Sequence, residues 1–126
     1  MTPHAGEMAH LTGLAKDEIA ADPPRIAPLA AARWNACVAL NGSVTYLAQP
    51  DATAWRFDGG APGPVTSSSG DTLAGLIGGL AARGAAPLQA AACGVLLHAS
   101  AGGDVLSKRC GEVGCLAREL SAEVRR

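Results

Sequence analysis

The residues best suited to chemistry are Ser68, Ser69, Gly70 and Asp71, which stand directly before an apolar stretch with helical periodicity. A helix that begins here leaves its first backbone N–H groups unpaired, and together with the helix dipole these groups favour a bound anion. A carboxylate at the same place accepts a proton from a hydroxyl that attacks a phosphoryl group. The run therefore indicates a phosphate site with Asp71 as a base beside it.

Asp71 also has a purely structural interpretation. Aspartate is a preferred N-cap residue, and the sequence alone favours capping over catalysis. The two roles are compatible, because a helix N-terminus stabilises the ionised carboxylate that a base requires.

Composition narrows the class of protein. The 126 residues are 48% hydrophobic with a formal net charge of −1, which predicts one globular domain. Lysine and arginine are scattered, so no nucleic-acid partner is expected. Neither a leader nor a membrane-spanning stretch is evident, so we expect no membrane partner and a cytoplasmic location. The cysteines and histidines lack zinc-site spacing, and no metal ligands are assigned.

The first half of the chain predicts three helices followed by strands. Two short helices are expected, ending near Gly13 and before Pro23-Pro24, and an alanine-rich helix follows them. A continuous apolar run then indicates a buried strand of a parallel or mixed sheet, and two alternating segments around a Pro-Asp turn indicate a hairpin. The predicted helices cover residues 5–12, 16–21 and 26–34, the buried strand 36–40, and the hairpin 44–49 with 54–57.

The second half predicts a loop and then helices. Residues 58–69 are rich in glycine, proline and serine, which indicates a long functional loop. One helix follows with a stripe of Leu73, Leu76, Ile77 and Leu80 before Gly84, and others are expected over 87–105 and 115–124. The fold class is therefore α/β, a small sheet of one buried strand plus a hairpin packed with several helices. Because aromatics are few among many alanines and glycines, close packing of small side chains must supply much of the core.

Five ordered segments resemble the ADP- or ATP-dependent NAD(P)H-hydrate dehydratases of the ribokinase-like superfamily. Their family patterns are T-P-H-P-G-E-M, L-K-G-x-x-T, G-x-P-G, G-[ST]-G-D-x-L-x-G and G-V-x-L-H-G-x-A-G. The corresponding segments are TPHAGEM (2–8), LNGSVT (40–45), GAPG (60–63), SSGDTLAG (68–75) and GVLLHASAG (94–102).

The resemblance implies a partial ribokinase-like fold, with residues 1–126 as the C-terminal half of a dehydratase domain. It implies phosphorylation of the ring hydroxyl of hydrated NADH or NADPH by ADP or ATP with Mg²⁺, followed by loss of phosphate. Asp71 would be the base and His4 would contact the substrate. The residues that would bind the nucleotide are Asn41, Gly42, Ser43, Val44 and Thr45, with Ser68, Ser69 and Gly70 as the anion hole.

The sequence departs from the family pattern in three ways. Asn41 stands where the family has lysine, and Ser67 and Ser68 stand where it usually has glycine. Met1 directly precedes the Thr-Pro-His motif, so the resemblance implies that the family's preceding half is absent and that the buried strand lacks neighbours. We therefore expect a homo-oligomer or a complementing chain.

Simpler interpretations stay open for several of these residues. Near a chain end, His4 is more often just an exposed side chain, and Asn41-Gly42 is explained by a turn between strands. His10 and His98 are assigned no chemistry. For the whole chain, the alternatives are a catalytically impaired remnant that binds adenine nucleotide or a partner chain and, less favoured, a small-molecule kinase.

Overall fold

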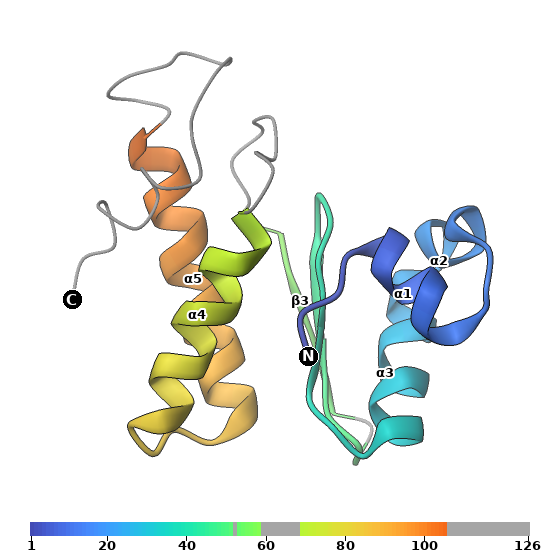
Figure 1. Ribbon diagram of the computed structural model, residues 1–126, viewed down its shortest axis with the longest axis horizontal. Helices are drawn as coiled ribbons and strands as arrows, with labels where there is room; N and C mark the ends of the chain where they lie inside the picture. The colour runs from blue at the N-terminus through green and yellow to red at the C-terminus, as the bar shows by residue number, and fades with distance from the viewer. Residues whose placement is uncertain (52, 59–68, 106–126) are drawn as a thin grey trace. The chain divides into compact units, whose positions relative to one another are not determined.

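The computed structural model describes residues 1–51, 53–58 and 69–105. The chain divides into two compact units, Met1–Asp58 and Gly59–Arg126. The single domain predicted over residues 1–126 stays a prediction. The elements of the described ranges, labelled in Figure 1, are α1 (Ala5–Thr12), α2 (Lys16–Ala21), α3 (Pro23–Trp34), β1 (Val38–Leu40), β2 (Thr45–Ala48), β3 (Ala54–Phe57), α4 (Ser69–Ala82) and α5 (Pro87–Val105).

The helices α1 and α2 have their predicted bounds. Gly13 ends α1 in the left-handed region, with a φ of 76°, and its N–H donates to the carbonyl of Ala9 at 2.9 Å. This cap favours glycine because a residue without Cβ adopts positive φ at no steric cost.

Helix α3 begins at Pro23 and not at Ile26 as predicted. Proline is tolerated in the first turn of a helix because its missing N–H would have no helical partner there. The two prolines therefore follow the end of α2 and also open α3. Asn35 ends α3 at a φ of 48°, which asparagine tolerates better than most residues.

The three strands form an antiparallel sheet in the order β1-β2-β3. Leu40 of β1 lies opposite Tyr46 of β2. Leu47 of β2 lies opposite Trp55 of β3, which confirms the predicted hairpin as β2 and β3. The predicted strand over 36–40 is confirmed for Val38–Leu40, where all three residues are buried. Helix α3 packs on one face of this sheet, on the side where α1 and α2 also lie (Figure 1).

The second edge of β1 is occupied by the first residues of the chain. The N–H of Ala39 donates to the carbonyl of Met1 at 2.8 Å, and the N–H of Asn41 donates to the carbonyl of Pro3 at 2.9 Å. The bridge between His4 and Asn41 is parallel. The expectation that this strand lacks neighbours is therefore wrong, since β1 has an antiparallel neighbour on one edge and a parallel one on the other.

The core of the first unit is built largely from small side chains, as expected from composition. Alanine supplies four of the nine buried residues of the cluster, so the helices approach the sheet closely. Trp34 and Tyr46 pack against its margin, only partly buried. The cluster consists of Met8, Ile19, Ile26, Ala27, Ala30, Ala31, Val38, Leu40 and Ala48.

In the described part of the second unit, the helices α4 and α5 are antiparallel and pack side by side (Figure 1). Gly84, with a φ of 98°, lies in the turn between them. Leu73 is buried and Ile77 is half-buried on the predicted stripe of α4. A Cβ added to Gly94 would lie 2.5 Å from Cγ1 of Ile77, so glycine sets the spacing of the two helices at this point.

Helix α5 has its predicted bounds, Pro87–Val105. The predicted loop over 58–69 and the helix over 115–124 fall mainly or wholly outside the described residues. In the part of the chain that the structure describes, no helix is both long and apolar enough to span a membrane.

The stability of the folded state depends on pH through the thiol of Cys37. Burial raises its pKa, against a smaller opposing effect of the Met1 ammonium group. A raised pKa in the folded state means that folding favours the protonated thiol, so the contribution to stability is present at neutral pH and is lost as the pH rises above about 9. We expect the thermal unfolding midpoint to fall less between pH 8 and pH 10 in Cys37→Ala than in the parent, whereas an equal fall would contradict this coupling.

Candidate functional site

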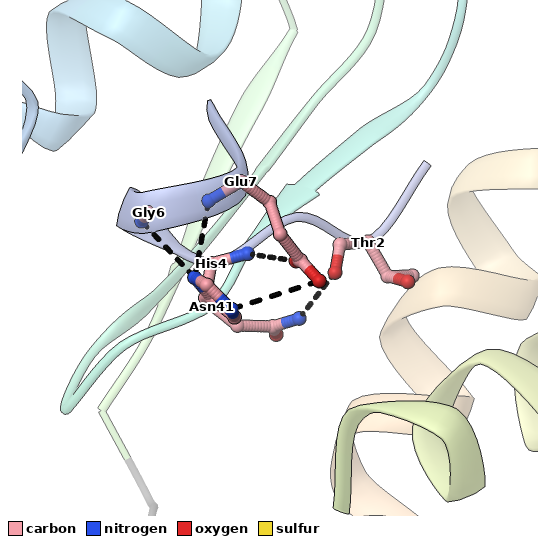
Figure 2. A network of polar contacts seen from close by, with 5 residues as sticks. All are labelled: Thr2, His4, Gly6, Glu7 and Asn41. Carbon is pink, nitrogen blue, oxygen red and sulfur yellow. Dashed lines mark hydrogen bonds and ion pairs between the residues drawn. The ribbon is translucent and has the colours of Figure 1, made fainter. Parts of the chain in front are cut away.

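The first unit brings two of the predicted site segments together. The segment that ends at His4 runs beside β1, and the loop that begins at Asn41 follows that strand directly. Figure 2 shows the polar network that results, with Thr2, His4, Gly6, Glu7 and Asn41. Two motifs that are distant in the sequence therefore share one polar network.

His4 is the N-cap of α1. Its Nδ1 accepts hydrogen bonds from the N–H groups of Gly6 at 3.0 Å and Glu7 at 3.2 Å. In return, Oε2 of Glu7 accepts from the N–H of His4 at 2.9 Å, which completes a capping box (Figure 2). The other imidazole nitrogen, Nε2, lies 3.6 Å from Oε1 of Glu7. The interpretation of His4 as only an exposed terminal side chain is therefore incomplete.

Gly6 and Glu7 are functional candidates that the sequence prediction did not assign. A Cβ on Gly6 would lie 2.9 Å from Cε1 of His4, so a larger residue would push the imidazole away from its cap. The available signal was the spacing of His4 and Glu7, which matches a capping box with histidine in place of serine or threonine.

The side chain of Asn41 holds the N-terminal segment against the sheet. Its Nδ2 donates to the carbonyl of Thr2 at 3.0 Å, a hydrogen bond that joins positions 39 residues apart. The residue is half-buried, and its backbone N–H donates to the carbonyl of Pro3. Asn41 therefore has a structural task at the position where the resemblance predicts a nucleotide contact.

Removing this side chain should loosen the N-terminal segment. We expect Asn41→Ala to lower the free energy of unfolding by about 1 kcal/mol, because the carbonyl of Thr2 loses its side-chain donor. Asn41→Asp should cost more, since its carboxylate oxygens have no proton to donate to that carbonyl. Urea unfolding measures both effects, with the exposed Ser43→Ala as the control. Unchanged stability in both Asn41 variants would show that the contact contributes nothing.

The rest of the predicted nucleotide loop connects β1 to β2. Gly42 and Ser43 are exposed, whereas Val44 and Thr45 are half-buried. The turn interpretation of Asn41-Gly42 is confirmed, because the strands on either side are antiparallel neighbours. Exposure leaves the backbone of Gly42 and Ser43 accessible to a ligand.

The second unit holds the predicted base. Asp71 is exposed in the first turn of α4, as its third residue, and Gly70 precedes it. The interpretation of Asp71 as the N-cap is wrong, because the helix already begins at Ser69. The carboxylate still lies at the positive end of the helix dipole. Ser67, Ser68 and the side chain of Ser69 lie outside the described residues.

The described residues contain no group of three or more His, Cys, Asp and Glu side chains that could hold a metal ion. A metal in this part of the chain would therefore have at most one or two protein ligands of these kinds. Asp71 and Glu7 are the exposed carboxylates of the two motif regions, one in each unit.

A family model described as NAD(P)H-hydrate dehydratase matches residues 1–126. The chain belongs to this family. Among curated members, an ADP-dependent (S)-NAD(P)H-hydrate dehydratase of Xanthomonas campestris is 50% identical over 98% of this chain, which covers 43% of that protein. The predicted family membership is thus confirmed.

Solved structures confirm the fold class of this dehydratase-family chain. An ADP/ATP-dependent NAD(P)H-hydrate dehydratase of Bacillus subtilis, co-crystallised with ATP and Mg²⁺, matches with a TM-score of 0.88 at 29% identity over 98% of this chain and 44% of its own. A ribokinase-like superfamily protein of Enterococcus faecalis matches with a TM-score of 0.76 at 27% identity over 98% of this chain and 41% of its own. The fold is therefore the predicted partial ribokinase-like one, and the chain spans less than half the length of these relatives.

Proposed function

We propose that this chain is the Asp71-bearing part of a nucleotide-dependent dehydratase that repairs hydrated NADH and NADPH. The observation that carries the proposal is the Gly70-Asp71 step in the first turn of α4, in a family member that is 50% identical to an ADP-dependent relative. A carboxylate at this end of a helix is stabilised in its ionised form, and that form accepts a proton.

In the proposed reaction Asp71 accepts the proton of the hydroxyl group on the hydrated nicotinamide ring. The hydroxyl oxygen attacks the terminal phosphoryl group of ADP or ATP, and the bond from that group to the rest of the nucleotide breaks. The ring phosphate then leaves as inorganic phosphate while the adjacent ring carbon loses a proton, which restores the double bond. Backbone N–H groups at the start of α4, around Ser69 and Gly70, would stabilise the charge on the transferring phosphate.

We assign adenine-nucleotide binding to residues 41–45 and 68–70. The ATP and Mg²⁺ of the Bacillus relative support this assignment, and so does the exposure of Gly42 and Ser43. The described residues near the motifs offer single carboxylates instead of a cluster. That donor set fits Mg²⁺, which keeps several waters and binds chiefly to phosphate oxygens. When bound, the ion would neutralise phosphate charge.

We further propose that the chain acts within an assembly, either a homo-oligomer or a complex with a complementing chain. The greater length of the relatives supports the proposal, since the chain covers 43% of the Xanthomonas protein. Its expected ligands are NAD(P)H hydrate and adenine nucleotide, its expected location is the cytoplasm, and no nucleic-acid or membrane partner is proposed. Light scattering that shows a stable monomer at micromolar concentration, alone and with nucleotide, would refute the homo-oligomer.

The function is tested by incubating the protein with hydrated NADH, ADP or ATP, and Mg²⁺. We expect the near-ultraviolet absorbance of the reduced nicotinamide ring to return, and to return only when nucleotide is present. A well-folded protein that restores no absorbance would refute the enzymatic proposal.

A second candidate is a remnant that binds adenine nucleotide without turnover. Asn41 favours it, because an amide replaces the family's lysine and cannot supply the cation that pairs with phosphate. Calorimetry with ADP separates the outcomes, since binding without restored absorbance favours the remnant. Activity that appears in Asn41→Lys would identify a decayed enzyme. The matching family model is that of the dehydratases, which disfavours the kinase alternative.

A further inference from the structure

Asn41 joins the start of the predicted nucleotide loop to the N-terminal segment, residues 1–4. Its backbone N–H donates to the carbonyl of Pro3 at 2.9 Å, within the parallel bridge between His4 and Asn41. Its side-chain Nδ2 donates to the carbonyl of Thr2 at 3.0 Å (Figure 2). One residue directly after β1 therefore holds two successive carbonyls of the segment.

The N-terminal segment has a docked and an open state. In the docked state it lies along the edge of β1, where the N–H of Ala39 also donates to the carbonyl of Met1 at 2.8 Å. A short edge segment held by a few hydrogen bonds opens locally at a lower free energy than the core. The side chain of Asn41 adds a hydrogen bond that is lost on opening, so it favours the docked state.

The loop that begins at Asn41 depends on the same contacts. Gly42 and Ser43 are exposed and follow Asn41 directly, so the position of Asn41 sets where their backbone leaves the sheet. With the segment docked, the backbone and the side chain of Asn41 are both held. With the segment open, both hydrogen bonds are lost. A ligand that contacts the loop backbone therefore binds the docked state more tightly, because the start of the loop is preorganised there.

The side chain of Asn41 acts on such a ligand through this position. Nδ2 donates to the carbonyl of Thr2, a partner in the N-terminal segment and not in the loop. The neutral amide also brings no positive charge to a phosphate. Asn41 is thus a positioning residue for the loop, whereas Gly42 and Ser43 expose the backbone that a nucleotide would contact.

We infer that Asn41 couples the binding of adenine nucleotide at residues 41–45 to the docking of the N-terminal segment against β1. The inference rests on the proposed function, because it specifies how that function's nucleotide site regulates a second part of the chain. Such coupling is reciprocal, so nucleotide favours docking by the same factor by which docking favours nucleotide. The loss of one neutral hydrogen bond corresponds to a factor of about five.

The first test is amide hydrogen exchange of the full chain, with and without saturating ADP and Mg²⁺. The N–H groups at positions 39 and 41 report docking directly, because their acceptors are carbonyls of the segment. We expect ADP to slow their exchange about fivefold in the parent protein and less than about twofold in Asn41→Ala. The N–H of Gln49, which donates to Thr53 at 2.8 Å in the turn between β2 and β3, is the internal reference and should not change.

The second test is the dissociation constant of ADP, measured by calorimetry well below the unfolding temperature of each variant. Asn41→Ala should bind ADP about fivefold more weakly, because the ligand must then hold the start of the loop without the side-chain bond. Thr12→Ala is the matched control, since Oγ1 of Thr12 likewise donates to a backbone carbonyl, that of Met8 at 2.7 Å, but within α1. It should bind ADP as the parent does.

Two results would overturn the coupling without touching the dehydratase proposal. If Asn41→Ala bound ADP more weakly but kept the full slowing of exchange at saturation, Asn41 would contact the nucleotide directly. If Thr12→Ala lost as much affinity as Asn41→Ala, general destabilisation would explain both variants.

The remaining outcomes separate the coupling from the proposed function. ADP that binds the parent without slowing exchange at positions 39 and 41 overturns the coupling and leaves nucleotide binding intact. Failure of the parent to bind ADP overturns both. Slowed exchange that depends on Asn41, in a protein that restores no absorbance from hydrated NADH, supports the coupling and refutes the enzymatic proposal.

Discussion

Replacing Asp71 with asparagine should reduce the turnover of hydrated NADH by about 10²- to 10⁴-fold, the usual contribution of a general base. The amide has nearly the shape of the carboxylate but cannot accept the hydroxyl proton. Because Asp71 is exposed in the first turn of α4, the substitution should cost less than about 1 kcal/mol of stability, through the weaker interaction with the helix dipole. The loss should therefore appear in kcat, with little change in the fold.

The measurement compares initial rates of absorbance recovery at saturating nucleotide for the parent and Asp71→Asn. Asp17→Asn is the matched control, because Asp17 is likewise an exposed acidic residue in the first turn of a helix, α2. It should retain the parent rate. If Asp71→Asn also kept that rate, Asp71 would not be the base, even if the protein were a dehydratase.

The second large effect concerns the packing of α4 against α5. Gly94→Ala should lower the free energy of unfolding of the second unit by about 1–3 kcal/mol, as is typical of overpacking. The new methyl would lie 2.5 Å from Cγ1 of Ile77 and 3.4 Å from its backbone nitrogen. Isoleucine is β-branched and stiff at χ1, so its side chain cannot move aside without backbone adjustment.

Gly79→Ala is the matched control for this substitution. Gly79 lies inside α4, is exposed, and has no atom within 4 Å of an added Cβ. There the same chemical change should stabilise the helix by about 0.5–1 kcal/mol. Chemical unfolding followed by far-ultraviolet circular dichroism measures both variants, and removing the obstructing side chain with Ile77→Ala should reduce the cost of Gly94→Ala. Equal effects at Gly79 and Gly94 would show that the helices do not meet closely at Gly94.

Structural features set by residues close together in the sequence were predicted more accurately than features set by residues far apart. The bounds of α1 and α5 were predictable because Gly13 and Pro87 act within one turn of the chain. The start of α3 was missed because Pro23-Pro24 is equally compatible with the end of one helix and the start of the next. The pairing of Met1–His4 with β1 has no local signal, since it joins residues far apart in the sequence.

The candidate site was predictable as a set of residues but not as a set of roles. The motifs identified His4 and Asn41. That Nδ1 of His4 caps α1 and that the Asn41 amide donates to the carbonyl of Thr2 depends on side-chain geometry, which the motifs do not give. For Asp71, a helix that starts at Ser69 and not three positions later at Thr72 places the residue in the first turn and not at the N-cap.

The pairing of the first residues with β1 also has a consequence for the order of folding. The hydrogen bonds between Met1 and Cys37 and between Thr2 and Asn41 close loops of 36 and 39 residues, whereas α1, α2 and α3 form from contacts within a few positions. Loop-closure entropy makes such distant contacts slow to form. We therefore expect docking of the N-terminal segment to be a late event in folding, with His4 taking its place beside Asn41 after the local helices have formed.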